Sequence, residues 1–442
     1  MQHSYEALDR GGGFNRVRLL DPLRHRDFRV LWGGMSVSLL GDGIFFVALA
    51  WQVYALSNVP AALAVVGVAM TVPTIGFLLL GGVISDRLDR RRVMLAADMT
   101  RGVAVGMIAL LSLAGVLRLW HVVVLAAIYS VGTAFFAPAF DAIVPEILPA
   151  ETLAQANSLD QFARPIAQRL AGPALGGLLI TKLGAGVAFA SDAGSFAVSG
   201  ASLLAMAARP RIPDDRPKSV AREMRAGFAY VRRRAWLWAT LASAAIAYLL
   251  FMGPTEVLLP FVVKNGLHGS AADLGVVFAA GGVGSVACAL ALAQHGLPRH
   301  EITFMYIFWT LATFAVAGYG LAHALWGLML ASLAFNALET AGTIIWATAK
   351  QRHVPALLLG RVSSLDWLIS IGLMPLSFAL TGPVSGAIGA RNTLIGAGAV
   401  GGIVTLAALL VPGVRTIEEP RGDEPPEPPV PMFNHAQAGV IP

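Results

Sequence analysis

Acidic side chains lie inside stretches of sequence that are otherwise apolar, and they are the residues most able to do chemistry there. The four candidates are Asp42, Asp192, Glu256 and Glu339. A charged side chain within a bilayer is costly, so such acids usually face a partner or a water-filled path. Burial raises the pKa of a carboxyl group and a nearby guanidinium lowers it, so a carboxyl exposed to each side in turn can carry a proton.

These four acids are therefore candidate proton-coupling residues. Asp42 has an alternative role, because it stands between Gly41 and Gly43 and such a segment can kink a helix. In that alternative role, the Asp42 carboxylate would make a structural hydrogen bond to neighbouring backbone or hydroxyl groups. Glu256 likewise has a structural role, or a position near the outer surface, as its alternative.

Arginines occur in the same apolar stretches. Arg101 follows Asp98 by three residues and Arg164 follows Asp160 by four, spacings that place each pair on one helix face. Internal pairing is favoured for Arg164 over contact with an anionic substrate. For Arg169, a substrate anion and an acid elsewhere in the fold both stay open.

The elements that hold these residues are predicted to be membrane-spanning helices. Hydrophobic residues make up 56% of the 442, charged residues 13%, and the mean hydropathy is +0.68. A bilayer core about 30 Å thick needs roughly 20 apolar residues of helix. Twelve such stretches are expected, at residues 29–56, 61–85, 93–115, 119–140, 156–181, 186–208, 236–262, 271–294, 301–321, 323–348, 362–388 and 392–412.

Basic residues are divided unevenly between the two sets of loops. The termini and the loops on their side hold 25 of the 32 Lys and Arg residues, and the opposite loops hold four. Cytoplasmic loops of membrane proteins are enriched in Lys and Arg. Both termini are therefore expected in the cytoplasm, and the pI near 9.8 reflects this topology rather than nucleic-acid binding.

The chain is expected to consist of two six-helix halves. "IVPEIL" and "GPALGG" are followed, 210 residues later, by "HVPALL" and "GPVSGA", and each pair of prolines is 28 residues apart. Such repeats are typical of transporters. The predicted parts are a cytoplasmic segment (1–28), a first half (29–208), a central loop with an amphipathic helix (209–235), a second half (236–412) and a disordered cytoplasmic tail (413–442).

The sequence resembles the major facilitator superfamily over nearly its whole length. The stretch "GGVISDRLDRRRVML" is similar to that superfamily's signature between the second and third spans, with Asp89 in place of a glycine. "GDGIFFVALAWQVY", "FFAPAFDAIVPEIL", "ANSLDQF" and "AKQRHVPALLLGRVSSLDW" resemble its enterobactin-exporter and macrolide-efflux-like branch. The resemblance implies a fold of twelve transmembrane helices in two pseudo-symmetric halves.

The resemblance also implies roles for particular residues. The loop signature acts as a conformational latch, in which Asp86 approaches the start of the eleventh span and Arg90 pairs with an acid at the end of the fourth, where Asp141 is available. The latch residues are Gly82, Asp86, Arg87, Arg90, Arg91 and Asp141. An antiporter-like motif is matched by Gly172, Pro173, Gly176 and Gly177, with Gln168 in place of its first glycine.

Spans one and seven line the central cavity in this superfamily, so residues deep on cavity-forming spans are candidates for substrate contact. The substrate-cavity candidates are Trp51, Tyr248, Phe251, Asn336 and Arg169. Packing and contact with lipid are the alternative roles of the aromatic residues.

The function expected is secondary export of amphipathic small molecules such as drugs, siderophores or lipophilic metabolites, by proton antiport with alternating access. The alternatives are nutrient uptake on the same fold and a non-transporting membrane protein. Histidine spacing and the single Cys288 offer no metal site, and no cofactor or enzyme activity is expected. The predicted partners are a small-molecule substrate and the bilayer of a bacterial inner membrane, with no nucleic acid, and the predicted state is a monomer.

Overall fold

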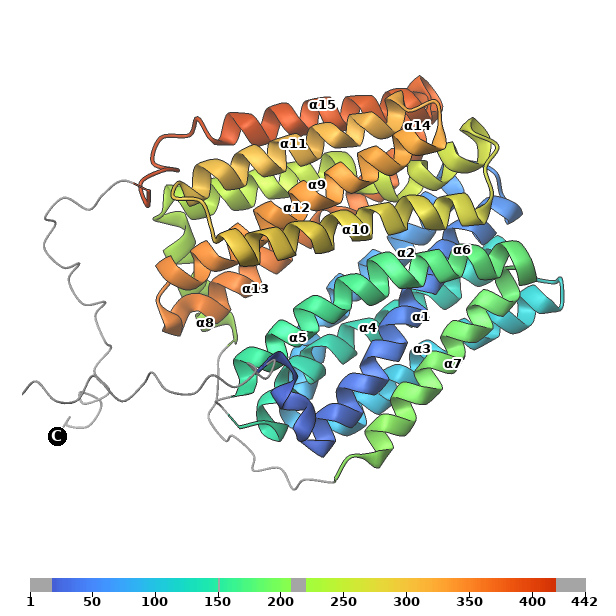
Figure 1. Cartoon of the computed structure of the whole chain (residues 1–442), viewed down its shortest axis with the longest axis horizontal. Helices are drawn as coiled ribbons and strands as arrows, with labels where there is room; N and C mark the ends of the chain where they lie inside the picture. The colour runs from blue at the N-terminus through green and yellow to red at the C-terminus, as the bar shows by residue number, and fades with distance from the viewer. Residues whose placement is uncertain (1–17, 150–151, 208–219, 419–442) are drawn as a thin grey trace, which may run out of the picture.

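A computed structural model describes residues 18–149, 152–207 and 220–418, and these residues form helices without any strand (Figure 1). In chain order the helices are η1 (Arg18–Arg24), α1 (Arg26–Leu56), α2 (Pro60–Arg87), α3 (Arg90–Leu113), α4 (Leu119–Ile147), α5 (Leu153–Pro165), η3 (Ile166–Ala171), α6 (Gly172–Leu183), α7 (Ala185–Ala205), α8 (Val220–Arg232), α9 (Ala235–Phe261), η4 (Val262–Gly266), α10 (Ala271–His295), α11 (Glu301–Leu321), α12 (Leu325–His353), α13 (Ala356–Gly372), α14 (Met374–Ile388) and α15 (Ala390–Ala408).

Ten helical segments within the described ranges are long and apolar enough to cross a membrane. The predicted all-α membrane fold is therefore confirmed. The predicted spans 156–181 and 392–412 correspond to α5–η3–α6 and to α15, which are not among the ten, so the count of twelve stays a prediction. The last helix also ends earlier than predicted, because Pro412 and the left-handed Gly413 (φ 85°) do not continue a helix.

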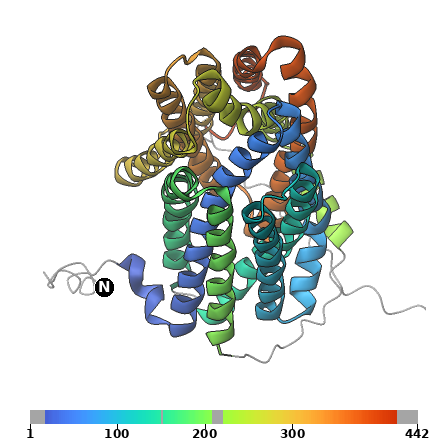
Figure 2. The same ribbon diagram turned by 90° about the vertical axis from the view of Figure 1, so that its right-hand side faces the viewer.

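The helices gather into two bundles. In the first bundle, α1, α3 and α4 pack with α7 and α2; in the second, α10, α11 and α12 pack with α9 and α15. Figures 1 and 2 show the blue-to-green bundle beside the yellow-to-red one. The bundles meet mainly where α2 packs on α14 and α6 packs on α10. The predicted domain limits themselves stay predictions, since the connection at 208–219 is outside the described residues.

The two ends of the assembly differ. We call the end with the α2–α3 and α12–α13 turns and α8 the basic end, because it carries Arg90, Arg91 and Arg92 and the arginines of α8 and its flank. The other end, with the α1–α2 and η4–α10 turns, is the opposite end. Tyr54 Oη donates to the carbonyl of Val257 (2.6 Å) there, and the amides of Asn58 and Asn265 bond reciprocally (2.7 and 3.1 Å). These hydrogen bonds join the two bundles at the opposite end.

Prolines interrupt two segments at corresponding places. The first is α5–η3–α6, with Pro165 before and Pro173 after the π-helix η3, and the second is α13–α14, with Pro375 and Pro383. Proline has no N–H to donate to the carbonyl four residues earlier, so each one weakens the α-helical ladder. Both pairs again differ by 210 in number, so the backbone breaks follow the sequence repeat.

The predicted disordered tail begins later than residue 413. Glu418 lies against α11, where its carboxylate accepts hydrogen bonds from the backbone N–H (2.7 Å) and Oγ1 (2.8 Å) of Thr303. An acid is stabilised at a helix N-terminus because the first N–H groups lack partners. Residues 413–418 are therefore packed turns, which corrects the prediction for this part. Residues 419–442, like 1–17, are outside the described ranges.

Candidate functional site

Asp42 lies in the core of the first bundle, with 5% of its surface exposed. Tyr129 Oη on α4 donates to its Oδ1 (2.7 Å), and Gln168 Nε2 on η3 donates to its Oδ2 (3.4 Å). The Tyr129 ring stacks on Phe45, with 4.7 Å between centroids, which fixes the hydroxyl in place. Helix α1 runs unbroken past Asp42, so the Gly-Asp-Gly sequence does not break the helix.

The two glycines beside Asp42 instead allow other helices to approach α1. A Cβ atom on Gly41 would collide with the Ser195 hydroxyl and with Asp192 Oδ1 of α7. A Cβ atom on Gly43 would lie 2.9 Å from the carbonyl oxygen of Gln168. Small residues permit this close packing of membrane helices. The sequence around Asp42 therefore positions it between α7 and η3.

Arg101 and Asp98 form a buried ion pair on α3, as their spacing predicted. Asp98 also accepts a hydrogen bond from Ser199 Oγ of α7 (2.6 Å). The guanidinium lies 4.4 and 4.6 Å from the ring centroids of Phe136 and Phe196, which gives cation–π contacts on two sides. Arg101 also acts electrostatically on Asp42.

Asp192 on α7 is fully buried and completes the group. Its Oδ1 accepts from Ser195 Oγ (3.2 Å), whereas its Oδ2 has no hydrogen-bond partner among the described residues. Asp192 interacts electrostatically with Asp42 and Arg101. We call Asp42, Asp98, Asp192 and Arg101 the acid cluster. It contains three carboxyl groups and one guanidinium.

A second polar group lies between the bundles. Arg169 Nη1 on η3 is 3.7 Å from Glu339 Oε2 on α12, and Glu339 Oε1 accepts from Thr343 (3.0 Å). Glu256 on α9 is exposed to solvent in the structure and interacts electrostatically with Arg169. Arg169 thus pairs with an acid of the other bundle, which was one of its two predicted roles.

Aromatic rings continue along the second bundle from this polar group. Tyr248 lies against Phe251 (5.5 Å between centroids), and Phe251 lies against Phe335 (5.7 Å). Tyr248 is also close enough to Glu339 and Arg169 to interact with them electrostatically. Asn336, another candidate, donates to the carbonyl of Ser332 within α12 (2.9 Å). The structure thus brings Tyr248, Phe251, Arg169 and both glutamates into one region.

Trp51 lies elsewhere, near the opposite end. Lys264 Nζ is 5.6 Å from its ring centroid and donates to the carbonyl of Tyr54 (2.5 Å). The antiporter-like motif serves packing: Gly172 and Gly176 adjoin α1, and Gly177 adjoins α10, where a Cβ atom would lie 2.5 Å from the carbonyl oxygen of Ala271.

The structure describes the contacts of some residues of the loop signature. Arg90 Nη1 donates to Glu146 Oε1 (2.5 Å) and to the carbonyl of Ala142 (2.7 Å), so the acid it meets on α4 is Glu146 and not Asp141. Asp141 instead lies near Arg164 and Asp160. A helix presents residues 142 and 146 on one face, one turn apart, which places residue 141 on another.

Two further positions of the loop signature have defined contacts. Arg91 Nη2 donates to the carbonyl of Leu204 on α7 (2.7 Å). Asp89, which replaces the signature glycine, caps α3 by accepting from the backbone N–H of Arg92 (3.3 Å). The surroundings of Gly82 and the side chains of Asp86 and Arg87 are outside what the structure describes, so their latch role stays a prediction.

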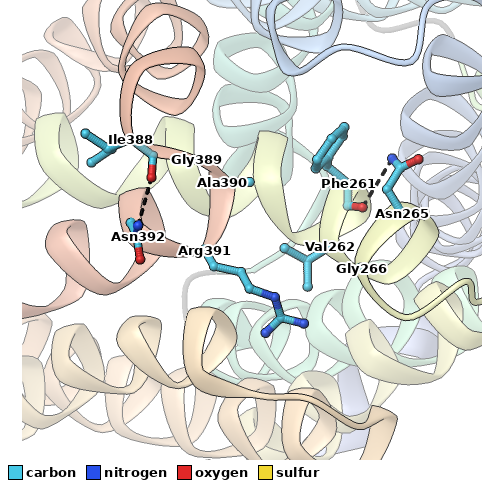
Figure 3. Close-up of a pocket in the computed structure, with 9 residues that line it drawn as sticks. All are labelled: Phe261, Val262, Asn265, Gly266, Ile388, Gly389, Ala390, Arg391 and Asn392. Atoms are coloured by element: carbon cyan, nitrogen blue, oxygen red, sulfur yellow. Dashed lines mark hydrogen bonds between the residues drawn. The ribbon is translucent and has the colours of Figure 1, made fainter.

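A pocket of about 410 Å³ lies apart from these groups, between η4 and the α14–α15 turn at the opposite end (Figure 3). Arg391 lines this pocket, and its Nη1 donates to the carbonyls of Gly320 (3.0 Å) and Ala322. Arg391 therefore caps the C-terminus of α11. None of the acids discussed above lines this pocket, so we do not assign transport to it.

The two-bundle fold with acids in its interior defines a multi-pass membrane transporter. The sequence pattern of the family described as transmembrane secretion effector matches residues 18–441. The chain belongs to this family, within the major facilitator superfamily, so the branch inferred from sequence motifs is confirmed.

Known proteins resemble the chain over most of its length. Macrolide efflux protein A of Streptococcus pyogenes is 24% identical over 411 residues, 89% of this chain and 96% of that protein. Enterobactin exporter EntS of Citrobacter koseri is 27% identical over 430 residues, 92% of this chain and 95% of that protein. A solved bacterial homologue of the human lysosomal transporter Spinster has a TM-score of 0.64 and 14% identity, covering 90% of this chain and 99% of its own, which shows the shared fold.

Proposed function

We propose that the chain is a proton-driven exporter of amphipathic small molecules in a bacterial inner membrane, with both termini in the cytoplasm. The efflux and export functions in the names of its relatives favour outward transport of small molecules. The basic end favours the proposed orientation, because Lys and Arg concentrate in cytoplasmic loops. In that orientation the opposite end faces away from the cytoplasm.

The proposal of proton coupling rests on the acid cluster. If all its groups were ionised, three carboxylates and one guanidinium would leave a net charge of −2 in a buried site. Uncompensated buried charge is costly, so a proton on one carboxyl stabilises the cluster. Arg101 and Ser199 hold Asp98, which leaves Asp42 and Asp192 to exchange the proton. The Oδ2 of Asp192, which has no hydrogen-bond partner within the described part of the chain, offers a second site for it.

The contacts between the bundles support alternating access. Tyr54, Asn58, Lys264 and Asn265 join the bundles at the opposite end, so in the proposed orientation this conformation loads substrate from the cytoplasm. The region of Glu256, Arg169, Glu339 and Tyr248 lies between the bundles, where a substrate would meet both. Release then requires these end contacts to open and the proton to return through the acid cluster.

The test uses purified protein in lipid vesicles with a pH-sensitive dye and a panel of macrolides, catecholate siderophores and dyes. We expect export that depends on an imposed pH gradient, and proton release when substrate is added. Asp42→Asn keeps the side-chain shape but cannot ionise, so both effects should disappear while the folded yield is kept. Asp21→Asn, the same change outside the bundles, is the matched control and should leave both unchanged. Undiminished proton release in Asp42→Asn would remove Asp42 from coupling, and inward accumulation would favour uptake.

A further inference from the structure

The π-helix η3 contacts both the acid cluster and the second bundle through neighbouring side chains. Its last turn contains a bond from the N–H of Gly172 to the carbonyl of Ala167, five residues earlier. Pro173 follows immediately and cannot donate to the carbonyl of Arg169, which removes an α-helical bond at this place. Single π turns inside α-helices are frequent at functional sites.

Consecutive residues of η3 point to different partners. Gln168 Nε2 donates to Asp42 Oδ2 in the first bundle (3.4 Å), and Arg169 Nη1 lies 3.7 Å from Glu339 Oε2 in the second. Gln168 is also the position where the antiporter-like motif has a glycine, which has no side chain to reach Asp42. The contact to the buried carboxylate is therefore a feature of this chain's own residue.

The backbone of η3 is held on both sides. A Cβ atom on Gly43 of α1 would lie 2.9 Å from the carbonyl oxygen of Gln168. A Cβ atom on Gly282 of α10 would lie 2.6 Å from the carbonyl oxygen of Arg169. Packed interiors have little free volume, so a displacement of η3 toward or away from α1 must move it relative to α10 as well.

We propose that η3 couples protonation of Asp42 to separation of the two bundles, with Gln168 and Arg169 as positioning residues; this rests on the proton antiport proposed above. With Asp42 ionised, the Gln168 amide donates to Oδ2 and holds η3 so that Arg169 pairs with Glu339. A proton taken up from the aqueous phase onto Oδ2 turns that oxygen into an O–H donor and a weaker, uncharged acceptor, so the hydrogen bond from the Gln168 amide is weakened. The amide must then turn its oxygen to Asp42 or leave it, η3 shifts, and Arg169 separates from Glu339.

The variant that tests this is Gln168→Met, which keeps the length of the side chain and removes its hydrogen bonds. Gln52→Met, the same change on α1 away from η3, is the matched control. The readout is substrate affinity as a function of pH in vesicles, together with proton release on substrate addition. Couplings between sites commonly change affinity roughly 5- to 150-fold. We expect the wild type and Gln52→Met to show such a pH dependence.

In Gln168→Met we expect the pH dependence of affinity to flatten to less than about twofold, well below the usual coupling range. Affinity at high pH should stay close to that of the wild type, since the substrate region is intact. A purely structural role would instead lower folded yield or affinity at every pH. The charge-reversed pair Arg169→Glu with Glu339→Arg should restore coupling that Arg169→Glu alone abolishes, because it rebuilds the contact between the bundles.

A second readout follows the bundles directly. In a Cys288→Ser background, Asn58→Cys and Asn265→Cys place two thiols where the amides now bond (2.7 Å), so cross-linking reports closure of the opposite end. We expect cross-linking to vary with pH in the wild type and to become independent of pH with Gln168→Met. Unchanged pH dependence in Gln168→Met would overturn the coupling by η3. A wild type without any proton release would instead refute the proposed proton antiport itself.

Discussion

Lys264 provides a direct test of how the opposite end is held closed. It belongs to the second bundle, yet its ammonium donates to the carbonyl of Tyr54 (2.5 Å) in the last turn of α1. The last carbonyls of a helix lack intrahelical partners, and a cation is favoured there. Lys264 therefore caps a helix of the other bundle. Lys264→Met keeps most of the aliphatic chain and removes the charge.

The expected magnitude follows from the two contacts that disappear. A hydrogen bond from a charged donor contributes about 1.5–3 kcal/mol. The contact with Trp51, at 5.6 Å, adds about 0.5–1 kcal/mol at an exposed site. Because Lys264 is only partly buried, water replaces part of both contacts, and we take about 1.5 kcal/mol. That is roughly a tenfold change in the ratio of closed to open conformations.

The assay measures distances between spin labels on Val116→Cys and Trp326→Cys, exposed positions at the opposite end in different bundles, with Cys288→Ser as background. Lys264→Met should move population from the short to the long distance by roughly tenfold in the ratio. Lys182→Met removes a charge at the same end in the last turn of α6 and is the control. Identical distance distributions for Lys264→Met and the wild type would refute the capping argument.

Two further changes test the packing and the acid cluster. Gly177→Val should hold α6 away from α10, because a Cβ atom would lie 2.5 Å from the carbonyl oxygen of Ala271, and the same labels should report loss of the short distance. Gly76→Val should not, because no atom of the described residues lies within 4 Å of a Cβ atom there. Asp98→Asn leaves Arg101 buried without its ion pair and should cost about 3–5 kcal/mol, seen as a lower midpoint of thermal unfolding in detergent. An unchanged midpoint would contradict a buried Asp98–Arg101 pair.

Hydropathy and helix spacing were sufficient for much of this molecule. The long apolar runs predicted the membrane fold, and the intervals of three and four residues predicted the Asp98–Arg101 and Asp160–Arg164 pairs, the latter with 3.2 Å between Nη2 and Oδ2. These features are local, because residues three or four apart share a face wherever the helix lies.

Partners distant in the chain could not be predicted in the same way. Asp42 meets Tyr129 and Gln168, which are 87 and 126 residues away, and only helix packing brings them together. One indication of a special role for Gln168 was available in the sequence, because Gln168 stands where the antiporter-like motif has a glycine. The choice between Asp141 and Glu146 as the acceptor for Arg90 depended on the facing side of α4, which sequence spacing between separate helices does not determine.

The helix breaks near Pro165 and Pro375 lie at equivalent positions of the two halves but carry different side chains. Both segments retain the interruption at the same repeat position, so duplication preserved two matching bending points. The first segment carries Gln168 and Arg169 at its irregular turn, whereas the residues 210 positions later in the second segment are Phe378 and Ala379. Under the coupling proposed for η3, the first break responds to the charge of Asp42, whereas the second break, with apolar residues at the equivalent positions, only bends.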